Sequence, residues 1–225
     1  MMKRCLIPVL LVFSLLLILP AKPAYSEEPV NFPDENLEQA IRDAIGKPSS
    51  EKIYPSDLEG LTELKAENMD ISDLTGLGYC SALEKLDLSQ NNISGISPIS
   101  NLESLQLLDL WHNEVSDISP ISSLGNLEVL VLHDNRISDE DLHVLSDMTQ
   151  LVRLYLDFNN ISDISPLSGL TNLRDLSIHE NAISDITPLT NMTELRGLTL
   201  GSNNISDISP LSELTQLEGL HLGGN

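Results

Sequence analysis

LVRLYLDFNNISDISPLSGLTN, residues 151–172, is the clearest copy of a unit that the chain repeats to its last residue. Six of the seven complete copies are 22 residues long, and the copy at residues 127–150 has 24. An eighth copy starts at Leu217 and stops at Asn225. Self-similarity at this period indicates a solenoid, in which stacked units share one continuous core. The complete copies begin at Leu61, Leu83, Leu105, Leu127, Leu151, Leu173 and Leu195.

Two apolar patterns alternate within each copy, whose first leucine is counted here as position 1. Positions 4 and 6 alternate with polar residues, as in a short strand with one buried face. Positions 11, 14, 17 and 20 are apolar in a tighter segment that contains proline in five copies. Stacked copies are therefore expected to form a parallel sheet on one face and turns on the other.

Two polar residue types recur at fixed positions. Asparagine occupies position 9 from Asn91 to Asn225, and Met69 replaces it in the first copy. A buried amide both donates and accepts, so this column is expected to satisfy backbone groups of its own and adjacent coils. Aspartate at position 13, from Asp73 to Asp207, is expected to accept hydrogen bonds from turn backbone. Calcium bridging along this column is the alternative, although no glycine-punctuated loop accompanies it.

Residues 1–26 have the pattern of a secretory signal peptide. Lys3 and Arg4 precede an apolar stretch at 6–19, and Ala24-Tyr25-Ser26 has the small-x-small form of a cleavage site. The apolar stretch is shorter than the roughly 20 residues that span a bilayer. The sequence therefore predicts a secreted or cell-surface protein that is not an integral membrane protein once the signal is removed.

Residues 27–60 are expected to form an N-terminal cap. Within NLEQAIRDAIGKP, the apolar residues Leu37, Ala40, Ile41, Ala44 and Ile45 follow helical spacing, and glycine and proline come next. Such a helix, with a charged outer face, can cover the apolar edge of the first coil at residues 61–82. A partner-binding helix is the alternative reading.

The charge of the chain limits its partners. Without residues 1–26 it has nine basic and 34 acidic residues, a net charge of −25. Such a surface repels phosphate backbones and anionic membranes, so no nucleic-acid binding is expected. Only Cys80 remains after residue 26, at a position where other copies carry leucine or methionine, so we expect it to be buried.

The repeat at residues 61–225 resembles the 22-residue class of leucine-rich repeat, and the whole of residues 27–225 fits this resemblance. A chain with a signal peptide and a helix that leads into ISDISPL repeats is similar to bacterial surface proteins of the internalin type. The resemblance implies an α/β horseshoe solenoid, with a parallel sheet on its concave face and 3-10 segments on its convex face. It also implies that the concave sheet binds another protein.

Positions 3, 5, 7 and 8 are expected to point away from the core, and they vary between copies. Three aromatic residues and four histidines, among them His221, fall on these positions. Exposed aromatic side chains among apolar ones are typical of binding hot spots. Large side chains that merely cover a wide sheet are the alternative. The predicted partner-binding residues are Leu107, Asp109, Trp111, His112, Val129, Val131, His133, Arg153, Tyr155, Asp157, Phe158 and His179.

Other functions have weaker support in the sequence. His133, Asp157 and His179 share position 7 on consecutive copies, which raises the hypothesis of a metal-dependent hydrolase. No nucleophile pattern, phosphate loop or paired metal motif accompanies them, so neither catalytic residues, a metal nor a cofactor is predicted. A glycan partner, a regulatory scaffold of the intracellular phosphatase-binding type, and self-association through Leu217, Leu220 and Leu222 remain as alternatives.

Overall fold

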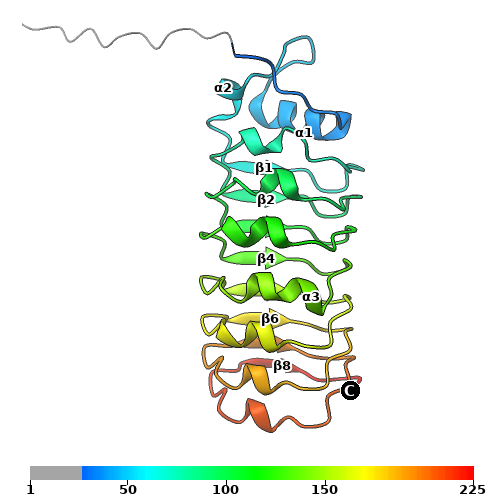
Figure 1. The fold of residues 1–225 in the computed structure, drawn as a ribbon, viewed down its shortest axis with the longest axis vertical. Helices are drawn as coiled ribbons and strands as arrows, with labels where there is room; N and C mark the ends of the chain where they lie inside the picture. Colours follow the sequence, from blue (N-terminus) through cyan, green and yellow to red (C-terminus); the bar gives the residue numbers. More distant parts are fainter. Residues whose placement is uncertain (1–26) are drawn as a thin grey trace, which may run out of the picture.

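Each copy of the repeat forms one coil of a solenoid in the computed structural model, which describes residues 27–225 (Figure 1). Eight parallel strands pair in sequence order in one sheet. Each strand has three residues at positions 3–5 of its copy, as the alternation predicts. The strands are β1 (Glu63–Lys65), β2 (Lys85–Asp87), β3 (Leu107–Asp109), β4 (Val129–Val131), β5 (Arg153–Tyr155), β6 (Asp175–Ser177), β7 (Gly197–Thr199) and β8 (Gly219–His221).

The register keeps equivalent residues side by side along the sheet. Leu64 pairs with Leu86, and the pairing continues through Leu130 and Leu154 to Leu220. The pairing of Leu130 with Leu154 crosses the 24-residue copy, so its two additional residues are accommodated away from the sheet. One core of leucine and isoleucine side chains runs from the cap to the seventh coil, as the repeat predicts.

Short helices occupy the face opposite the sheet (Figure 1). Proline stands in the first turn of five of them, where its fixed φ suits the helix and its missing N–H is not needed. The 24-residue copy has a true α-helical turn here, in α3 (Asp139–Leu142). The 3-10 helices are Leu77–Tyr79, Ser97–Ile99, Ser119–Ser123, His143–Leu145, Ser165–Gly169, Thr187–Leu189 and Ser209–Leu211.

The asparagine column joins each coil to the one before it. The Nδ2 group of Asn91 donates to the carbonyls of Ala66, Leu88 and Ser89 at 2.7–3.1 Å. Its Oδ1 accepts from the backbone N–H groups of Met69 and Ile71. Similar bonds recur down the column as far as Asn225. The prediction that these amides satisfy backbone groups of two coils is confirmed.

The aspartate column behaves as expected in five of six copies. The carboxylate of Asp117 accepts from the backbone N–H of Ser119, two residues later, at 2.8 Å. Asp73, Asp163, Asp185 and Asp207 do the same in their copies. Asp139 differs because it starts α3, and its carboxylate instead accepts from backbone N–H groups of Ser162 and Asp163 in the next coil.

The cap helix α1 (Glu35–Ile45) is fixed to the first coil through its N-cap residue. One oxygen of Asp34 accepts from the N–H groups of Asn36 and Leu37, which have no partner inside the helix. The other accepts from the N–H groups of Ser72 and Asp73 at 2.8 and 3.2 Å. The helix ends at Gly46, which adopts the left-handed conformation with φ of 66°.

Two details of the predicted cap helix are wrong. Ala44 is exposed rather than buried, since the helix turns this side away from the first coil. Arg42, expected on the charged outer face, is buried. Its guanidinium donates to Glu38 Oε1 at 2.7 Å and to the carbonyl of Pro48 at 2.8 Å, so it closes the loop behind the helix. The short α2 (Pro55–Leu58) then leads into β1.

Asp34 gives a testable prediction about pH. Burial alone would raise the pKa of Asp34, but the backbone N–H groups of Ser72, Leu37, Asp73 and Asn36 outweigh burial and lower it. A carboxylate with a lowered pKa in the folded state stabilises the fold above its unfolded pKa of about 3.9, and this stabilisation is lost as the pH falls through the folded pKa.

We therefore expect Asp34→Ala to lower the free energy of unfolding by about 1–2 kcal/mol at pH 7, with a smaller difference from wild type near pH 3. Urea unfolding of both proteins at the two pH values measures this. An equal difference at both pH values would contradict the assignment.

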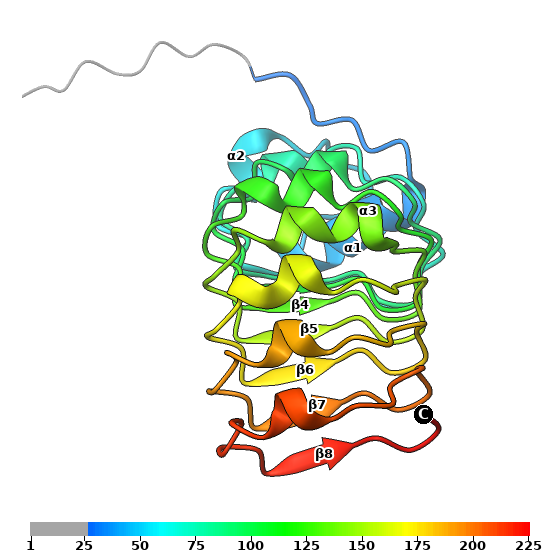
Figure 2. The ribbon, with the colours of Figure 1, turned by 60° about the horizontal axis from the view of Figure 1, so that its bottom comes forward.

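Three further predictions concern single features. Cys80 is buried, as expected, and burial raises the pKa of its thiol to about 12. The signal peptide at residues 1–26 lies outside the described residues. At the far end of the sheet, in β8 (Figure 2), Leu220 is exposed while Leu217 and Leu222 are partly buried, and self-association through this edge stays a prediction.

Within residues 27–225, no helix has the length and apolar character that a membrane crossing requires.

Candidate functional site

The concave sheet face consists of the outward side chains at positions 3, 5, 7 and 8 of the coils. It has two rows of rings. In the first row, the Trp111 and His133 ring centroids lie 5.6 Å apart, and those of His133 and Tyr155 lie 6.3 Å apart. These residues follow or end three successive strands, so the sheet register sets their spacing. Trp111 is 38% exposed, and the row presents ring surface to solvent.

A second row begins in the coil where the first row ends, which contains both Tyr155 and Phe158. The Phe158 ring meets His179 edge-on, with centroids 5.5 Å apart, and His179 lies 5.8 Å from His221. His179 and His221 belong to coils that are not neighbours, and Gly201 stands between them. A Cβ on Gly201 would lie 2.7 Å from the His221 ring, so His221 reaches back only because this residue is glycine. Phe158 is 53% exposed.

Asp157 is placed differently from the prediction. It was expected to be an exposed contact residue, but it is only 8% exposed. Its Oδ1 accepts from Ser177 Oγ at 2.5 Å and from the His179 N–H at 2.7 Å, and its Oδ2 lies 3.3 Å from His133 Nδ1. Burial alone would raise the pKa of Asp157, but these hydrogen bonds lower it. Asp157 therefore lies beneath both rows, bonded to the ring of His133 in the first and to the backbone of His179 in the second.

The backbone at position 8 adopts the left-handed conformation, which was not predicted from the sequence. From Asn68 to Ser202, the residue here adopts positive φ between 51° and 55° in all seven complete coils, and Gly224 follows in the eighth. Asn, Asp and Gly, which tolerate positive φ best, stand here in three of the eight copies, which is a weak signal for this conformation. Phe158 holds this conformation although phenylalanine gains nothing from it, and its ring is thereby carried to the rim of the concave face.

The remaining predicted residues surround the two rows. Leu107, Val129 and Val131 are partly buried and form an apolar floor beside Trp111. Asp109 lies next to them; burial raises its pKa, and the negative charge of Asp87 adds to this although the Trp111 N–H acts against it. Two exposed pairs stand on either side, a hydrogen-bonded pair of His112 and Asp134 and an ion pair between Arg153 Nε and Asp175 Oδ2 at 3.3 Å.

The metal-site hypothesis finds no support in the geometry. Among residues 27–225, no three His, Cys, Asp or Glu side chains are grouped so that they could hold a metal ion. The carboxylate of Asp157 is occupied by the hydrogen bonds described above. The Nδ1 atom of His179 is buried and has no hydrogen-bond partner within the same residues.

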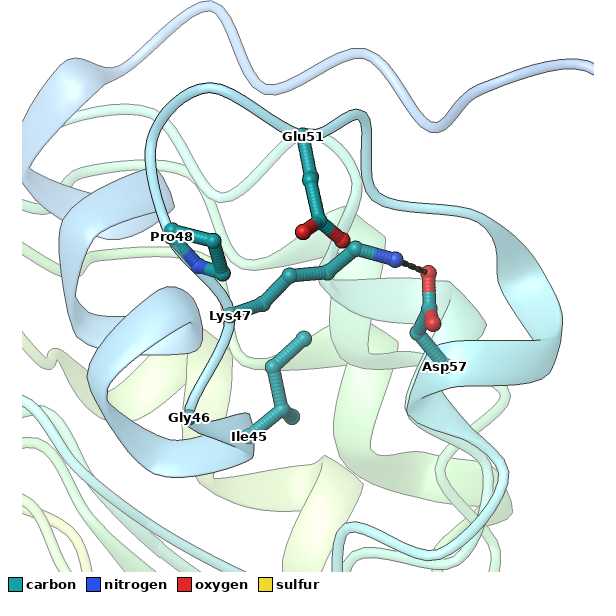
Figure 3. Close-up of a pocket in the computed structure, with 6 residues that line it drawn as sticks. All are labelled: Ile45, Gly46, Lys47, Pro48, Glu51 and Asp57. Carbon is teal, nitrogen blue, oxygen red and sulfur yellow. Dashed lines mark hydrogen bonds and ion pairs between the residues drawn. The ribbon is translucent and has the colours of Figure 1, made fainter.

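A separate hollow of about 320 Å³ lies in the N-terminal cap (Figure 3). Lys47 Nζ donates to Asp57 Oδ2 at 2.5 Å across it, and the same ammonium lies 5.6 Å from the Tyr54 ring centroid. The pair joins the end of α1 to α2, so its charges serve the cap rather than a ligand. The hollow is lined by Ile45, Gly46, Lys47, Pro48, Glu51 and Asp57.

Three residues of the concave face were not among the predicted contacts. Ser177 and His221 complete the hydrogen-bond and ring rows, and Gly201 makes room for His221. All three stand at positions 5 or 7, where the variable columns of the repeat could have indicated them. The residue types in a column do not show which neighbouring side chain each residue contacts.

Comparisons with known proteins agree with this architecture. A family model described as leucine rich repeats in two copies matches residues 81–123 and 149–191, and a second leucine-rich-repeat model matches residues 103–161. A comparison with curated proteins gave no match.

Solved structures resemble the chain over most of its length. Internalin C2 of Listeria monocytogenes is 31% identical, with 90% of this chain and 100% of that chain covered and a TM-score of 0.72. Internalin F of the same species is 33% identical, with 91% and 74% covered and a TM-score of 0.58. A leucine-rich-repeat protein of Leptospira interrogans is 26% identical, with 76% and 45% covered and a TM-score of 0.67. The chain therefore belongs to the internalin-like family of leucine-rich-repeat proteins, which are protein-interaction modules.

Proposed function

We propose that this protein is a secreted or cell-surface binding module, without catalytic activity, whose concave sheet face binds a protein partner. The observation that carries the proposal is the exposure of two rows of rings on one face, centred on Trp111, His133, Tyr155 and Phe158. The coil does not need these side chains, because other coils have serine or glycine at the same positions. Large aromatic groups at the centre of a surface are the usual anchors of protein interfaces.

The location outside the cytoplasm is supported by two observations. The sequence of residues 1–26 has the pattern of a secretory signal, and the similar solved structures include internalins of Listeria monocytogenes. A protein partner is favoured over a glycan because the rings are spread along several strands as a broad surface. An intracellular regulatory scaffold would have no use for the signal.

Blocking one face at a time tests the proposal. In the protein without residues 1–26, and so without Cys5, the remaining Cys80 is buried and its thiol has a pKa of about 12, so an introduced cysteine can be labelled selectively in the folded protein. Val131→Cys places a label in the middle of the concave sheet face, and Ser122→Cys places the same label on the exposed opposite face. The label is a bulky polyethylene glycol maleimide.

We expect the label at residue 131 to reduce recovery of the partner in pull-down experiments by about tenfold or more, because it occupies the centre of the interface. The label at residue 122 should leave recovery unchanged. The partner is identified beforehand as a protein whose capture is competed by free unlabelled chain. Equal recovery with both labels would refute binding through the concave sheet face.

A further inference from the structure

The concave sheet face contains one small cavity that the two rows of rings do not fill. Its volume is about 140 Å³, and it spans β5, β6 and β7. Cavities that enclose a whole small molecule are larger, from about 300 Å³. The size therefore suits the end of one long side chain. The cavity is lined by Tyr155, Asp175, Leu176, Ser177, Gly197 and Thr199.

The residue at position 3 of the seventh coil, Gly197, lines the cavity and has no side chain. A Cβ at Gly197 would lie 2.7 Å from Asp175 Oδ1, closer than real contacts allow. Earlier coils have charged or branched side chains at this position, from Glu63 to Asp175. Because Gly197 has no side chain, the carboxylate of Asp175 can lie directly over the backbone of the next coil, at the wall of the cavity.

The polar groups around the cavity favour a cation. Asp175 Oδ2 lies 3.3 Å from Arg153 Nε, but both side chains are exposed, and such pairs contribute little. Its Oδ1 faces the floor above Gly197. The hydroxyl of Ser177 donates its proton to Asp157 at 2.5 Å, so toward the cavity it can only accept.

Tyr155 provides the aromatic wall. Its ring is half-buried, and burial raises the pKa of its hydroxyl. The negative charges of Asp175 and Asp157 raise this pKa further, while Arg153 acts against them. The surroundings of the ring are therefore negative on balance. A cation over a tyrosine face is attracted by the ring, and the attraction is greater where water is partly excluded.

We propose that this cavity receives an arginine side chain of the protein partner. The guanidinium would donate to Asp175, and its plane would stack on the ring of Tyr155. Arginine fits better than lysine, because a planar group with several donors can pair with a carboxylate and stack at the same time. The net charge of −22 of the whole chain also favours a partner with a basic surface. The inference rests on the proposed function of the concave sheet face and names the chemistry that this face selects.

Arg153 allows a change that is expected to strengthen cation binding rather than weaken it. Its guanidinium already neutralises part of the Asp175 charge and competes with an incoming cation. Replacing it by glutamine should therefore strengthen cation binding, whereas a residue with only a structural role would weaken binding or leave it unchanged.

The test is an NMR titration of the full chain with Nα-acetylarginine methylamide, followed at the backbone amides of Ser177, Gly197 and Thr199. The neutral isostere Nα-acetylcitrulline methylamide is the matched probe. We expect saturable shifts at these amides with the arginine probe and binding at least about tenfold weaker with the citrulline probe. Arg153→Gln should tighten binding of the arginine probe.

Two variants and their matched controls distinguish binding in the cavity from a general attraction of cations to the acidic surface. Gly197→Ala and Asp175→Asn should remove the shifts. Their controls should retain them: Gly219→Ala, the same position one coil later with no atom within 4 Å of the added Cβ, and Asp147→Asn, an exposed acid away from the sheet. If Gly197→Ala does not fold, Asp175→Asn alone decides the outcome.

Equal affinity for both probes, no saturable shift, or unchanged binding by Asp175→Asn would overturn the proposal. These outcomes are independent of the face-blocking experiment. If the label at residue 131 has no effect while the arginine probe binds, the proposed function fails and the cavity remains. If the label blocks the partner while the probe does not bind, only the arginine site fails.

Discussion

Replacing Asn91 by alanine is expected to lower the free energy of unfolding by about 3–5 kcal/mol, since several buried backbone groups lose their partners together. The side chain donates to the carbonyls of Ala66, Leu88 and Ser89 and accepts from the N–H groups of Met69 and Ile71. The Leu88 and Ser89 carbonyls also accept from Asn113 Nδ2 and the Asn68 N–H, so the Ala66 carbonyl and the two N–H groups are the ones left without a partner. Each buried polar group left without a partner costs about 1–3 kcal/mol. Water cannot replace the amide fully, because Asn91 is buried between two coils.

Asn92 provides the matched control. It is the next residue, it has the same side chain, and it is exposed. Asn92→Ala should change the free energy of unfolding by no more than about 0.5 kcal/mol. Urea unfolding followed by circular dichroism compares the two variants with wild type. Similar midpoints for Asn91→Ala and Asn92→Ala would show that the asparagine column does not hold the coils together.

The fold could be predicted from the sequence largely because the same structural pattern recurs in every copy of the repeat. A single asparagine such as Asn91 says little, but the same residue at position 9 of successive copies indicates a structural role. The two additional residues of the copy at residues 127–150 leave the strand pattern before and after them intact, and the structure accommodates them on the helical face, in α3.

What occurs only once in the chain was harder to predict. Arg42 follows the polar pattern of a helix surface, yet it is buried because Glu38 and the carbonyl of Pro48 pair with it. Asp139 stands in the aspartate column but bonds to the next coil, because the insertion turns its backbone into α3. Such contacts depend on neighbours that a linear pattern does not bring together.

Removing the two largest rings of the first row is expected to weaken partner binding at least about 100-fold, since hot-spot residues contribute about 2 kcal/mol or more each. Trp111→Ser and Tyr155→Ser are suitable changes, because the adjacent coils have Ser89 and Ser177 at the same positions. The coil therefore accepts serine there. We expect the double variant to keep its circular-dichroism spectrum and a cooperative unfolding transition.

The sequence predicted which face of the sheet holds the candidate site, but not how deeply each of its side chains is buried. The variable columns identified Trp111, Tyr155 and Phe158, whose rings the structure places toward solvent on one side of the sheet. They did not show that Asp157 lies beneath the histidines, because depth depends on hydrogen bonds from two adjacent coils. Nor did they show that Gly197 lets the carboxylate of Asp175 lie over the backbone of the next coil, because this depends on the position of the neighbouring side chain.

Pull-down of the partner by three proteins in parallel tests the central claim most directly. They are the wild type, the Trp111→Ser/Tyr155→Ser double variant, and Tyr79→Ser. Tyr79 is 54% exposed on the helical face, more than Trp111 or Tyr155, so its removal takes away a well exposed ring from the opposite face. Binding through the concave sheet face predicts that the double variant recovers no partner, while Tyr79→Ser recovers as much as wild type. Full recovery by the double variant, or loss only with Tyr79→Ser, would contradict it.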